Sequence, residues 1–385
     1  MRKLLTLLTG ICLAAAVMTG AGSEGILLEE KALELAGSSL RFPAVSGMED
    51  EALQEAVNSR IRDDLRVDRY LQRMNALISD EGRHIDVDWN GNIAGDVFSA
   101  LLDAEGAVES LRSSHVWTWS NVDLRDGHEI AFSELFAEEG TARETIEAYL
   151  EETVAPEMGP HLGNSALKPL PEGFRVERTG ITLLYDADQL STLSDRAGAV
   201  KIGWNEIREI ADWSEDGIPA RIGAAEMITL SAESAGRIRE MTESGQLPDI
   251  PVKIGDSVKE WTDRAHLLND PEEYFGGRMF ALEGAAFRDV YLLSDAVDSS
   301  WDKSRVQGIR ADRGCFQGLC IGETRAEEWH QLLGEPDDTA VLDEDAAERM
   351  RTVPGTCDYY LSGEYRLQLQ SDRDGMLVSI TLSGQ

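Results

Sequence analysis

The sequence predicts an α+β fold in which an antiparallel sheet carries helices on one side, followed by two small α+β units that each place a helix before strands. Three patterns support this prediction. Apolar residues recur at helical spacing from Asp50 to about Ser79. Apolar and polar residues alternate in several short segments, as they do in strands with one buried face. A similar order of turn and helix signals occurs twice near the C-terminus.

The first residues have the layout of a secretory signal peptide. Arg2 and Lys3 are basic, an apolar stretch runs to Met18, and small residues follow. The apolar stretch is shorter than the roughly 20 residues that span a bilayer, so we expect cleavage after Ala21 and removal of residues 1–21. No other apolar run is long enough to span. The sequence therefore predicts an extracytoplasmic protein, secreted or held in the cell envelope, with no membrane span after cleavage.

Acidic residues far outnumber basic ones. The chain has 71 Asp and Glu against 36 Lys and Arg, a formal net charge of -35. Because Arg2 and Lys3 leave with the signal peptide, the exported chain carries 34 minus 71, or -37. Such a surface repels phosphates, which argues against nucleic acid as a partner, and attracts cationic partners. Solubility is the simpler explanation of the charge when it is considered without other evidence.

The segment from Ile85 to Ile93 alternates apolar and polar residues up to Asn90-Gly91, a pair that favours a tight hairpin turn. Oxygen-bearing side chains at alternate positions before a glycine also begin calcium-binding loops. The twelfth position of such a loop needs a bidentate Glu, and here it is Val97. We therefore expect a hairpin and no calcium site.

Further strands are expected at residues 107–111 and 116–119, and a helix from about Thr141 to Thr153. Trp117 and Trp119 share one strand face, which His115 also shares if the strand begins early enough. An aromatic platform for a sugar is one interpretation. At two-residue spacing in an alternating strand, core packing is the more common role.

Several turn and strand signatures lie in order along the first half of the chain. They are Phe42-Pro43-Ala44-Val45-Ser46-Gly47, the run from Asn121 to Ile130, Glu134-Leu135-Phe136, Pro171-Glu172-Gly173-Phe174, the run from Gly180 to Tyr185, and Val200-Lys201-Ile202-Gly203-Trp204. With these signatures, residues 27 to 213 resemble paired extracytoplasmic domains of unknown function from Gram-positive bacteria. Such domains form the ectodomain of the anti-sigma-V factor and accompany some peptidoglycan deacetylases.

The resemblance implies an α+β domain, which we place at residues 22–225, and in the anti-sigma-V factor it implies capture of lysozyme. It also implies the cell envelope of a Gram-positive bacterium. The chain lacks a membrane span and a sigma-binding segment, so a signalling role does not carry over.

A helical linker is expected at residues 226–250, followed by two repeats at residues 251–312 and 313–385. In each repeat a glycine and an acid precede Ser257 or Thr324, which can cap a helix, with Glu three residues further on. The second repeat ends in a two-strand hairpin around Asp374-Gly375. The repeats are similar to the tandem units of beta-lactamase-inhibitor proteins and outer-membrane assembly lipoproteins, which implies a binding scaffold. Trp261 and Trp329 take comparable places in the repeat helices, as packing residues do.

Three cysteines remain after cleavage, namely Cys315, Cys320 and Cys357. In an oxidising exterior we expect one structural disulfide and one thiol, and the sequence leaves the pairing open. A zinc site is not expected, because no histidine lies near these cysteines.

No catalytic motif is recognised. The six histidines, at positions 84, 115, 128, 161, 266 and 330, lie apart, and neither His-Glu-x-x-His nor Gly-x-Ser-x-Gly occurs. We therefore predict no catalytic residue, no cofactor site and no metal site. The expected function is non-catalytic binding of a basic protein such as lysozyme, or of a cell-wall glycan. A cell-wall-modifying hydrolase that uses paired carboxylates is the alternative.

Overall fold

The computed structural model describes residues 25–79, 82–108, 114–154, 170–185, 198–250, 252–263, 272–274, 277–281, 290–295 and 303–385. The predicted signal peptide, residues 1–21, lies outside them. The chain forms two compact units. The first contains residues up to Glu177, Ile181–Val200 and Glu209–Gly223, and the second contains Arg178–Gly180, Lys201–Arg208 and Ala224–Gln385. Among the described residues, no helix is both long and apolar enough to cross a membrane.

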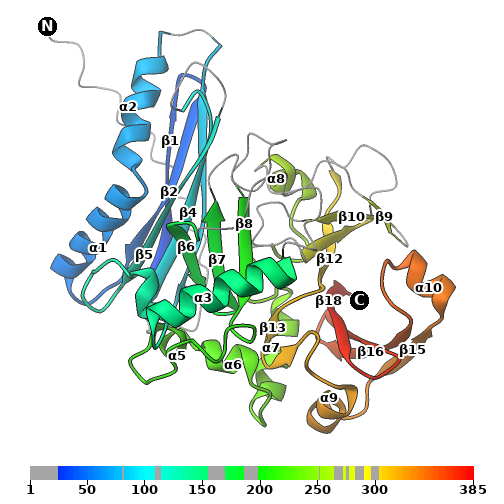
Figure 1. Ribbon diagram of the computed structural model, residues 1–385. Coiled ribbons are helices and arrows are strands. Elements are labelled where there is room, and N and C mark those ends of the chain that lie inside the picture. Colours follow the sequence, from blue (N-terminus) through cyan, green and yellow to red (C-terminus); the bar gives the residue numbers. More distant parts are fainter. Residues whose placement is uncertain are drawn as a thin grey trace, which may run out of the picture. The chain divides into compact units, whose positions relative to one another are not determined.

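The first unit is built on a five-stranded sheet in the order β1-β2-β3-β4-β5 (Figure 1). Its strands are β1 (Leu27–Leu35), β2 (Ser38–Ser46), β3 (Ile85–Ala94), β4 (Val97–Gly106) and β5 (Ser114–Asp123). All neighbouring strands are antiparallel except β2 and β3, which run parallel because two helices connect them. The predicted α+β fold with mainly antiparallel sheets is confirmed.

Those helices, α1 (Glu51–Asp64) and α2 (Val67–Leu77), cover one face of the sheet (Figure 1). The sequence predicted one helix from Asp50 to Ser79. The structure divides it at Arg66, whose φ of 55° is left-handed and ends the regular helical turn. The break keeps the apolar spacing on the sheet side, since Ile61, Leu65 and Tyr70 are all buried.

The predicted hairpin turn at Asn90-Gly91 is wrong. β3 runs through Gly91 to Ala94, and the chain turns at Gly95 and Asp96 instead. Gly91 has a packing role, because a Cβ placed on it would lie 2.7 Å from the Cβ of Ala100 on β4. The glycine thus permits a close approach of two strands. From the sequence alone, this role could not be distinguished from that of a glycine in a turn.

The opposite face of the sheet is met by β6 (Gly173–Glu177). The Ser99 hydroxyl accepts a hydrogen bond from the Val176 backbone at 2.9 Å, and the Asn121 amide donates to the Phe174 carbonyl at 2.8 Å. β6 begins the three-stranded sheet β6-β7-β8, with β7 at Gly180–Tyr185 and β8 at Gly198–Gly203.

Short helices complete the first unit after β5. They are the 3-10 helix η1 (Phe132–Leu135), α3 (Glu139–Tyr149), the π-helix η2 (Leu150–Val154) and α5 (Ile218–Arg221). The predicted helix at 141–153 corresponds to α3 and η2. The predicted strand at 107–111 is wrong for the two residues of it that the structure describes. β4 ends at Gly106, and the next residues, Ala107 and Val108, form a bend.

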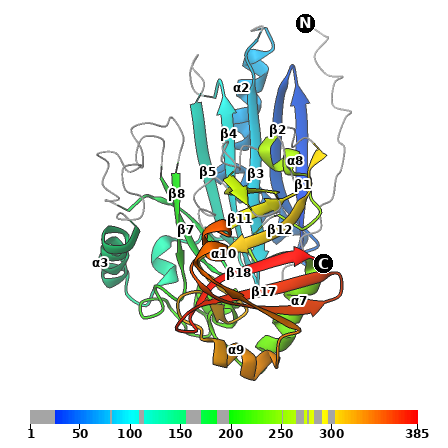
Figure 2. The ribbon, with the colours of Figure 1, turned by 90° about the vertical axis from the view of Figure 1, so that its right-hand side faces the viewer.

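The second unit is built on one eight-stranded sheet in the order β15-β16-β17-β18-β12-β11-β10-β9. Its central strands β17, β18, β12 and β11 are labelled in Figure 2. Its strands are β9 (Glu272–Tyr274), β10 (Gly277–Ala281), β11 (Val290–Ser294), β12 (Val306–Ala311), β15 (Asp338–Leu342), β16 (Gly355–Ser362), β17 (Tyr365–Asp372) and β18 (Leu377–Gly384). Strands from both predicted repeats, 251–312 and 313–385, therefore share one sheet. They join where β12 pairs with β18. The predicted final hairpin is confirmed by the pairing of β17 with β18.

The helices of the second unit are α6 (Ala224–Ile228), α7 (Ser234–Ser244), α8 (Val258–Asp263), α9 (Ala326–Leu333) and α10 (Glu344–Arg349). Part of the segment predicted as a linker, 226–250, lies in the core, because Ile238, Met241 and Leu247 are buried against the sheet. Trp329 is fully buried in the same core, and Trp261 packs against it half-buried. Both tryptophans are thus packing residues, as expected.

The predicted cap of the second repeat helix is shifted by one residue. The N-cap of α9 is Arg325, whose backbone N–H donates to the Glu328 carboxylate at 2.7 Å. The Thr324 hydroxyl instead accepts the Cys320 N–H at 2.8 Å, which ties the start of the helix to the preceding hairpin.

That hairpin consists of β13 (Cys315–Phe316) and β14 (Leu319–Cys320). Gln317 and Gly318 both have positive φ, 56° and 92°, the backbone that a two-residue hairpin turn favours. Cys315 and Cys320 form a disulfide, and Cys357 is a buried free thiol. The structure thus gives the pairing that the sequence left open.

Candidate functional site

Charged side chains gather in the first unit where β5 ends. After Asp123 the chain turns sharply, and the Val122 and Glu129 backbones pair again in an isolated bridge. The Gly127 N–H donates to the Asp123 carbonyl at 2.8 Å, and Gly127 has a φ of 79°. A residue with a Cβ disfavours this backbone, so the Asp-Gly-His turn depends on the glycine.

The buried part of the cluster contains Asp123, whose side chain is fully buried, and Arg221 of α5, whose side chain is 7% exposed. Arg221 Nη2 lies 2.8 Å from Asp123 Oδ2 and 2.6 Å from Asp96 Oδ1. Arg125 Nη2 also contacts Asp123 Oδ2 at 2.9 Å. Two guanidinium groups therefore contact two carboxylates, so that most of the buried charge is neutralised.

Burial raises the pKa of Asp123, but hydrogen bonds from the Arg125 side chain and backbone and the charge of Arg221 outweigh it. The net result is a pKa below the ordinary value of an aspartate. Asp123 is thus held as an anion, in a role that stabilises the start of β4 and the end of β5, where Val97 pairs with Asp123.

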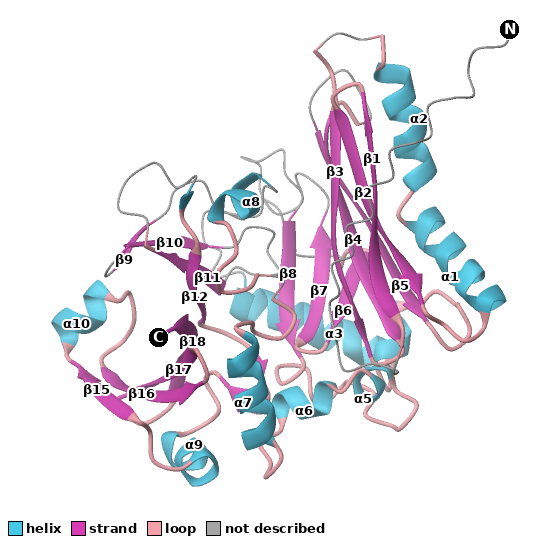
Figure 3. Cartoon of the chain, turned by 180° about the vertical axis from the view of Figure 1, so that it is seen from behind, coloured by secondary structure: helices cyan, strands magenta, loops and turns pink. Residues whose placement is uncertain are grey.

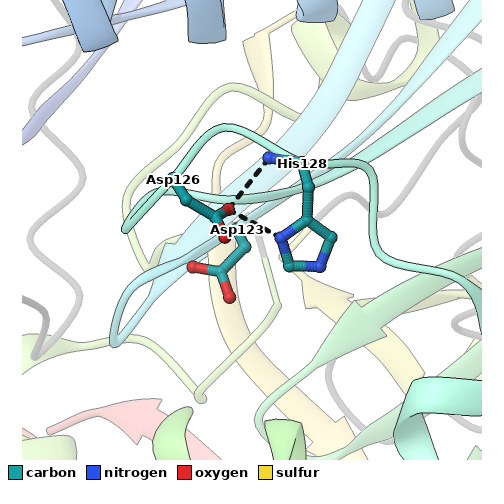
Figure 4. Close-up of side chains that lie close together, drawn as sticks. All are labelled: Asp123, Asp126 and His128. Atoms are coloured by element: carbon teal, nitrogen blue, oxygen red, sulfur yellow. Dashed lines mark hydrogen bonds and ion pairs between the residues drawn. The ribbon is translucent and has the colours of Figure 1, made fainter.

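The exposed part of the cluster is centred on His128 (Figure 4). Asp126 Oδ1 accepts hydrogen bonds from the His128 backbone N–H at 3.0 Å and from its Nδ1 at 2.6 Å. On the other side of the ring, His128 Nε2 lies 3.0 Å from Glu134 Oε2 of η1. Partial burial lowers the pKa of His128, while the two carboxylates raise it and leave it above its ordinary value.

We define the turn patch as Asp126 and Glu134, whose carboxylates contact His128, together with Glu129, the next residue along the chain. The side chains of Asp126, Glu129 and Glu134 are 63%, 59% and 40% exposed. Arg60 of α1 lies 3.4 Å from Glu129 and offsets part of the charge. The turn patch therefore presents negative charge to solvent on a tightly hydrogen-bonded turn.

Among the described residues, one set of three side chains has metal-ligating atoms within 4.8 Å of one another, namely Asp123, Asp126 and His128. The set does not fit a metal ion. Both oxygens of Asp123 accept hydrogen bonds from arginine, and both ring nitrogens of His128 contact carboxylates. A divalent ion here would also meet two guanidinium charges, so the cluster is better explained as an ion network.

The other positions considered in the sequence lie elsewhere. Asp86 and Asp88 stand on the extended strand β3, which does not wrap around an ion. Trp117 and Trp119 are half-buried, and the Trp119 ring packs against Gly173 of β6, as a packing residue does. His161 and His266 lie outside the described residues.

The sequence did not reveal the buried network, because Asp96, Asp123 and Arg221 lie in distant segments. A local signal was present for the exposed part, since Asp126-Gly127-His128 places two polar side chains on either side of a turn glycine. No site was predicted at this run, which contributes to the resemblance described above.

No family model matches the chain, and no curated protein matches its sequence. Among solved structures, the chain is similar to a DUF3298 family member from Bacteroides fragilis, with 13% identity, a TM-score of 0.37, and coverage of 53% of this chain and 98% of that one. A DUF3298 family protein from Pseudomonas aeruginosa has 12% identity and a TM-score of 0.36, and the match covers 49% of this chain and 95% of that chain.

A DUF4309 family protein from Bacillus subtilis has 14% identity and a TM-score of 0.26, and the match covers 40% of this chain and 98% of that chain. The neighbours are thus families of unknown function. Similarities this distant carry no argument about activity or ligand.

Proposed function

We propose that this protein is an extracytoplasmic, non-catalytic binding protein that holds a cationic protein through the turn patch. The observation that carries the proposal is the set of three exposed carboxylates of this turn, two of which, Asp126 and Glu134, are held by contacts with His128. The formal charge of -35 supports it, because a field of one sign accelerates encounter with a partner of the other sign.

The turn patch is suited to binding because its geometry is already fixed. The Asp126 carboxylate is held by the backbone and ring of His128, and Glu134 Oε1 accepts the Ala131 N–H at 2.6 Å. A partner would therefore order few side chains on contact, which lowers the entropic cost of association. Charge complementarity of this kind orients the two proteins and raises their association rate. High affinity also needs a side chain that is buried away from water at the centre of the interface.

A lysozyme is the partner we propose within this class. The run from Asn121 to Ile130, which includes Asp126 and Glu129, is one of the signatures by which residues 27 to 213 resemble the anti-sigma-V ectodomain. The positive charge of a basic lysozyme would also complement the negative charge of this chain. A wall glycan is the second ligand to include, since the same resemblance extends to proteins that accompany peptidoglycan deacetylases.

The test is equilibrium binding of the exported chain to lysozymes of several types, at low and at near-physiological salt. An equally basic, unrelated protein serves as the control, and soluble peptidoglycan fragments form a separate arm. Selective lysozyme binding that persists in salt supports the proposal. Binding shared with the control, or binding to none of the lysozymes, contradicts it. Turnover of the fragments contradicts the non-catalytic part.

A further inference from the structure

The feature that carries a further inference is the strand β15, which lies at one end of the eight-stranded sheet (Figure 3). It pairs with β16 on one side, and within the described part of the chain no strand pairs with its other side. An edge strand of this kind presents a row of backbone N–H and C=O groups that another extended chain can join.

β15 is held firmly in place. The Thr339 hydroxyl donates to Asp358 of β16 at 3.1 Å, and this carboxylate, whose side chain is 3% exposed, also accepts the Trp329 indole N–H at 3.1 Å. At the end of the strand, Leu342 is buried in a small cluster with Ala347 of α10. A strand fixed from both faces is ordered before any partner arrives.

The chemistry of this edge selects one kind of partner. Val341, the fourth of the five residues of β15, is 80% exposed. Residues 335 to 348 contain acids but no Lys, Arg or His, and all seven acids are exposed: Glu335, Asp337, Asp338, Asp343, Glu344, Asp345 and Glu348. Acids beside an edge disfavour pairing with a second copy, because like charges would meet.

We propose that the β15 edge binds an extended, lysine- or arginine-rich segment of a partner protein, which joins the sheet as an additional strand. Backbone hydrogen bonds supply affinity in this mode, and alternate side chains supply specificity. Apolar side chains of the segment lie against Val341, and its basic side chains meet the flanking acids. This surface belongs to the second unit and does not depend on the turn patch.

Peptide binding to the full exported chain tests the proposal. The probe is a fluorescent peptide of alternating Lys and Val, about nine residues long to cover a typical strand. A Glu and Val peptide is the charge control, and a version N-methylated at alternate backbone amides is the backbone control. We expect binding of the first peptide only, measured by anisotropy at near-physiological salt, with slowed amide hydrogen exchange in β15.

Variants locate the site. Val341→Ser, and separately the triple variant Glu335→Gln, Asp338→Asn and Asp345→Asn, should each weaken binding by about fivefold or more. Two matched controls should leave binding unchanged. One is Ile78→Ser, at another exposed apolar residue. The other is the α3 variant, with Glu138→Gln at the N-cap and Glu139→Gln and Glu144→Gln within the helix. Equal binding of the N-methylated peptide, or equal loss in the α3 variant, would overturn the proposal in favour of general charge attraction.

Discussion

The buried carboxylate of Asp123 is paired with the guanidinium of Arg221, with 2.8 Å between Oδ2 and Nη2. The pair joins the end of β5 to the short helix α5, far along the sequence. It is also the inner support of the turn that carries the turn patch. Loss of either charge should therefore affect the stability of the first unit.

Asp123→Asn should lower the free energy of unfolding by about 3 kcal/mol. The substitution removes one of the two carboxylates that neutralise the buried guanidinium of Arg221 and leaves it with Asp96 alone. Denaturant unfolding measures this change. Asp216→Asn is the matched control, since its side chain is 97% exposed beside Arg125, and it should change stability by less than about 0.5 kcal/mol. Equal effects of the two substitutions would show that the buried pair has no special role.

Gly91→Ala should destabilise the protein by about 1 to 3 kcal/mol, because the added Cβ meets Ala100 at 2.7 Å in a packed sheet. Gly140→Ala in α3 is the matched control. A Cβ there meets no atom within 4 Å, and alanine favours a helix, so stability should stay equal or rise. Thermal unfolding compares the two. A neutral Gly91→Ala would argue against the close approach of β3 and β4.

Removal of the disulfide by Cys315→Ser with Cys320→Ser should cost about 2 kcal/mol of unfolding free energy, a modest loss because the closed loop is short. Chemical unfolding of the double variant without reductant tests this. A loss near zero would show that the β13-β14 turn holds the loop without the bond.

Cys357 should resist thiol reagents in the folded protein. Burial raises the pKa of its thiol to about 11, so the reactive thiolate is scarce at neutral pH, and the sulfur is also shielded. For the chain without residues 1–21, titration with a coloured disulfide reagent should find no reactive thiol in the native state and one in denaturant. Rapid native labelling would contradict the buried position of Cys357.

His128 should give the first unit a pH-dependent contribution to stability. Its pKa is raised in the folded state, so the stabilisation is fully present below the unfolded value of about 6.5 and is lost as pH rises through the folded value. Since the side chain is 40% exposed, we expect no more than about 1 kcal/mol. His128→Gln should flatten this part of the profile, measured by unfolding between pH 5 and about 8.5. An unchanged profile would exclude His128 as its source.

The sequence predicted the elements whose signal is local. The helical spacing of Leu53, Val57 and Ile61 located α1, and Asp374-Gly375 located the final hairpin. It misplaced the turn near Gly91, because a glycine that permits close packing and a glycine that turns the chain look the same in one sequence. It could not give the contact between Asp123 and Arg221 either, since a pairing of distant segments leaves no periodic signal. The break between α1 and α2 at Arg66 was missed for a related reason, as the apolar spacing continues through it.

Binding of lysozyme to turn-patch variants tests the central claim most directly. The triple variant Asp126→Asn, Glu129→Gln and Glu134→Gln is compared by calorimetry at near-physiological salt with a charge-matched α3 variant. The α3 variant carries Glu138→Gln at the N-cap and Glu139→Gln and Glu144→Gln within the helix. We expect the turn-patch variant to lose about tenfold or more in affinity and the α3 variant to lose little, since specific contacts exceed the general field. If the two variants bind lysozyme equally, or the unaltered chain does not bind it, the turn patch is not the binding site that we propose.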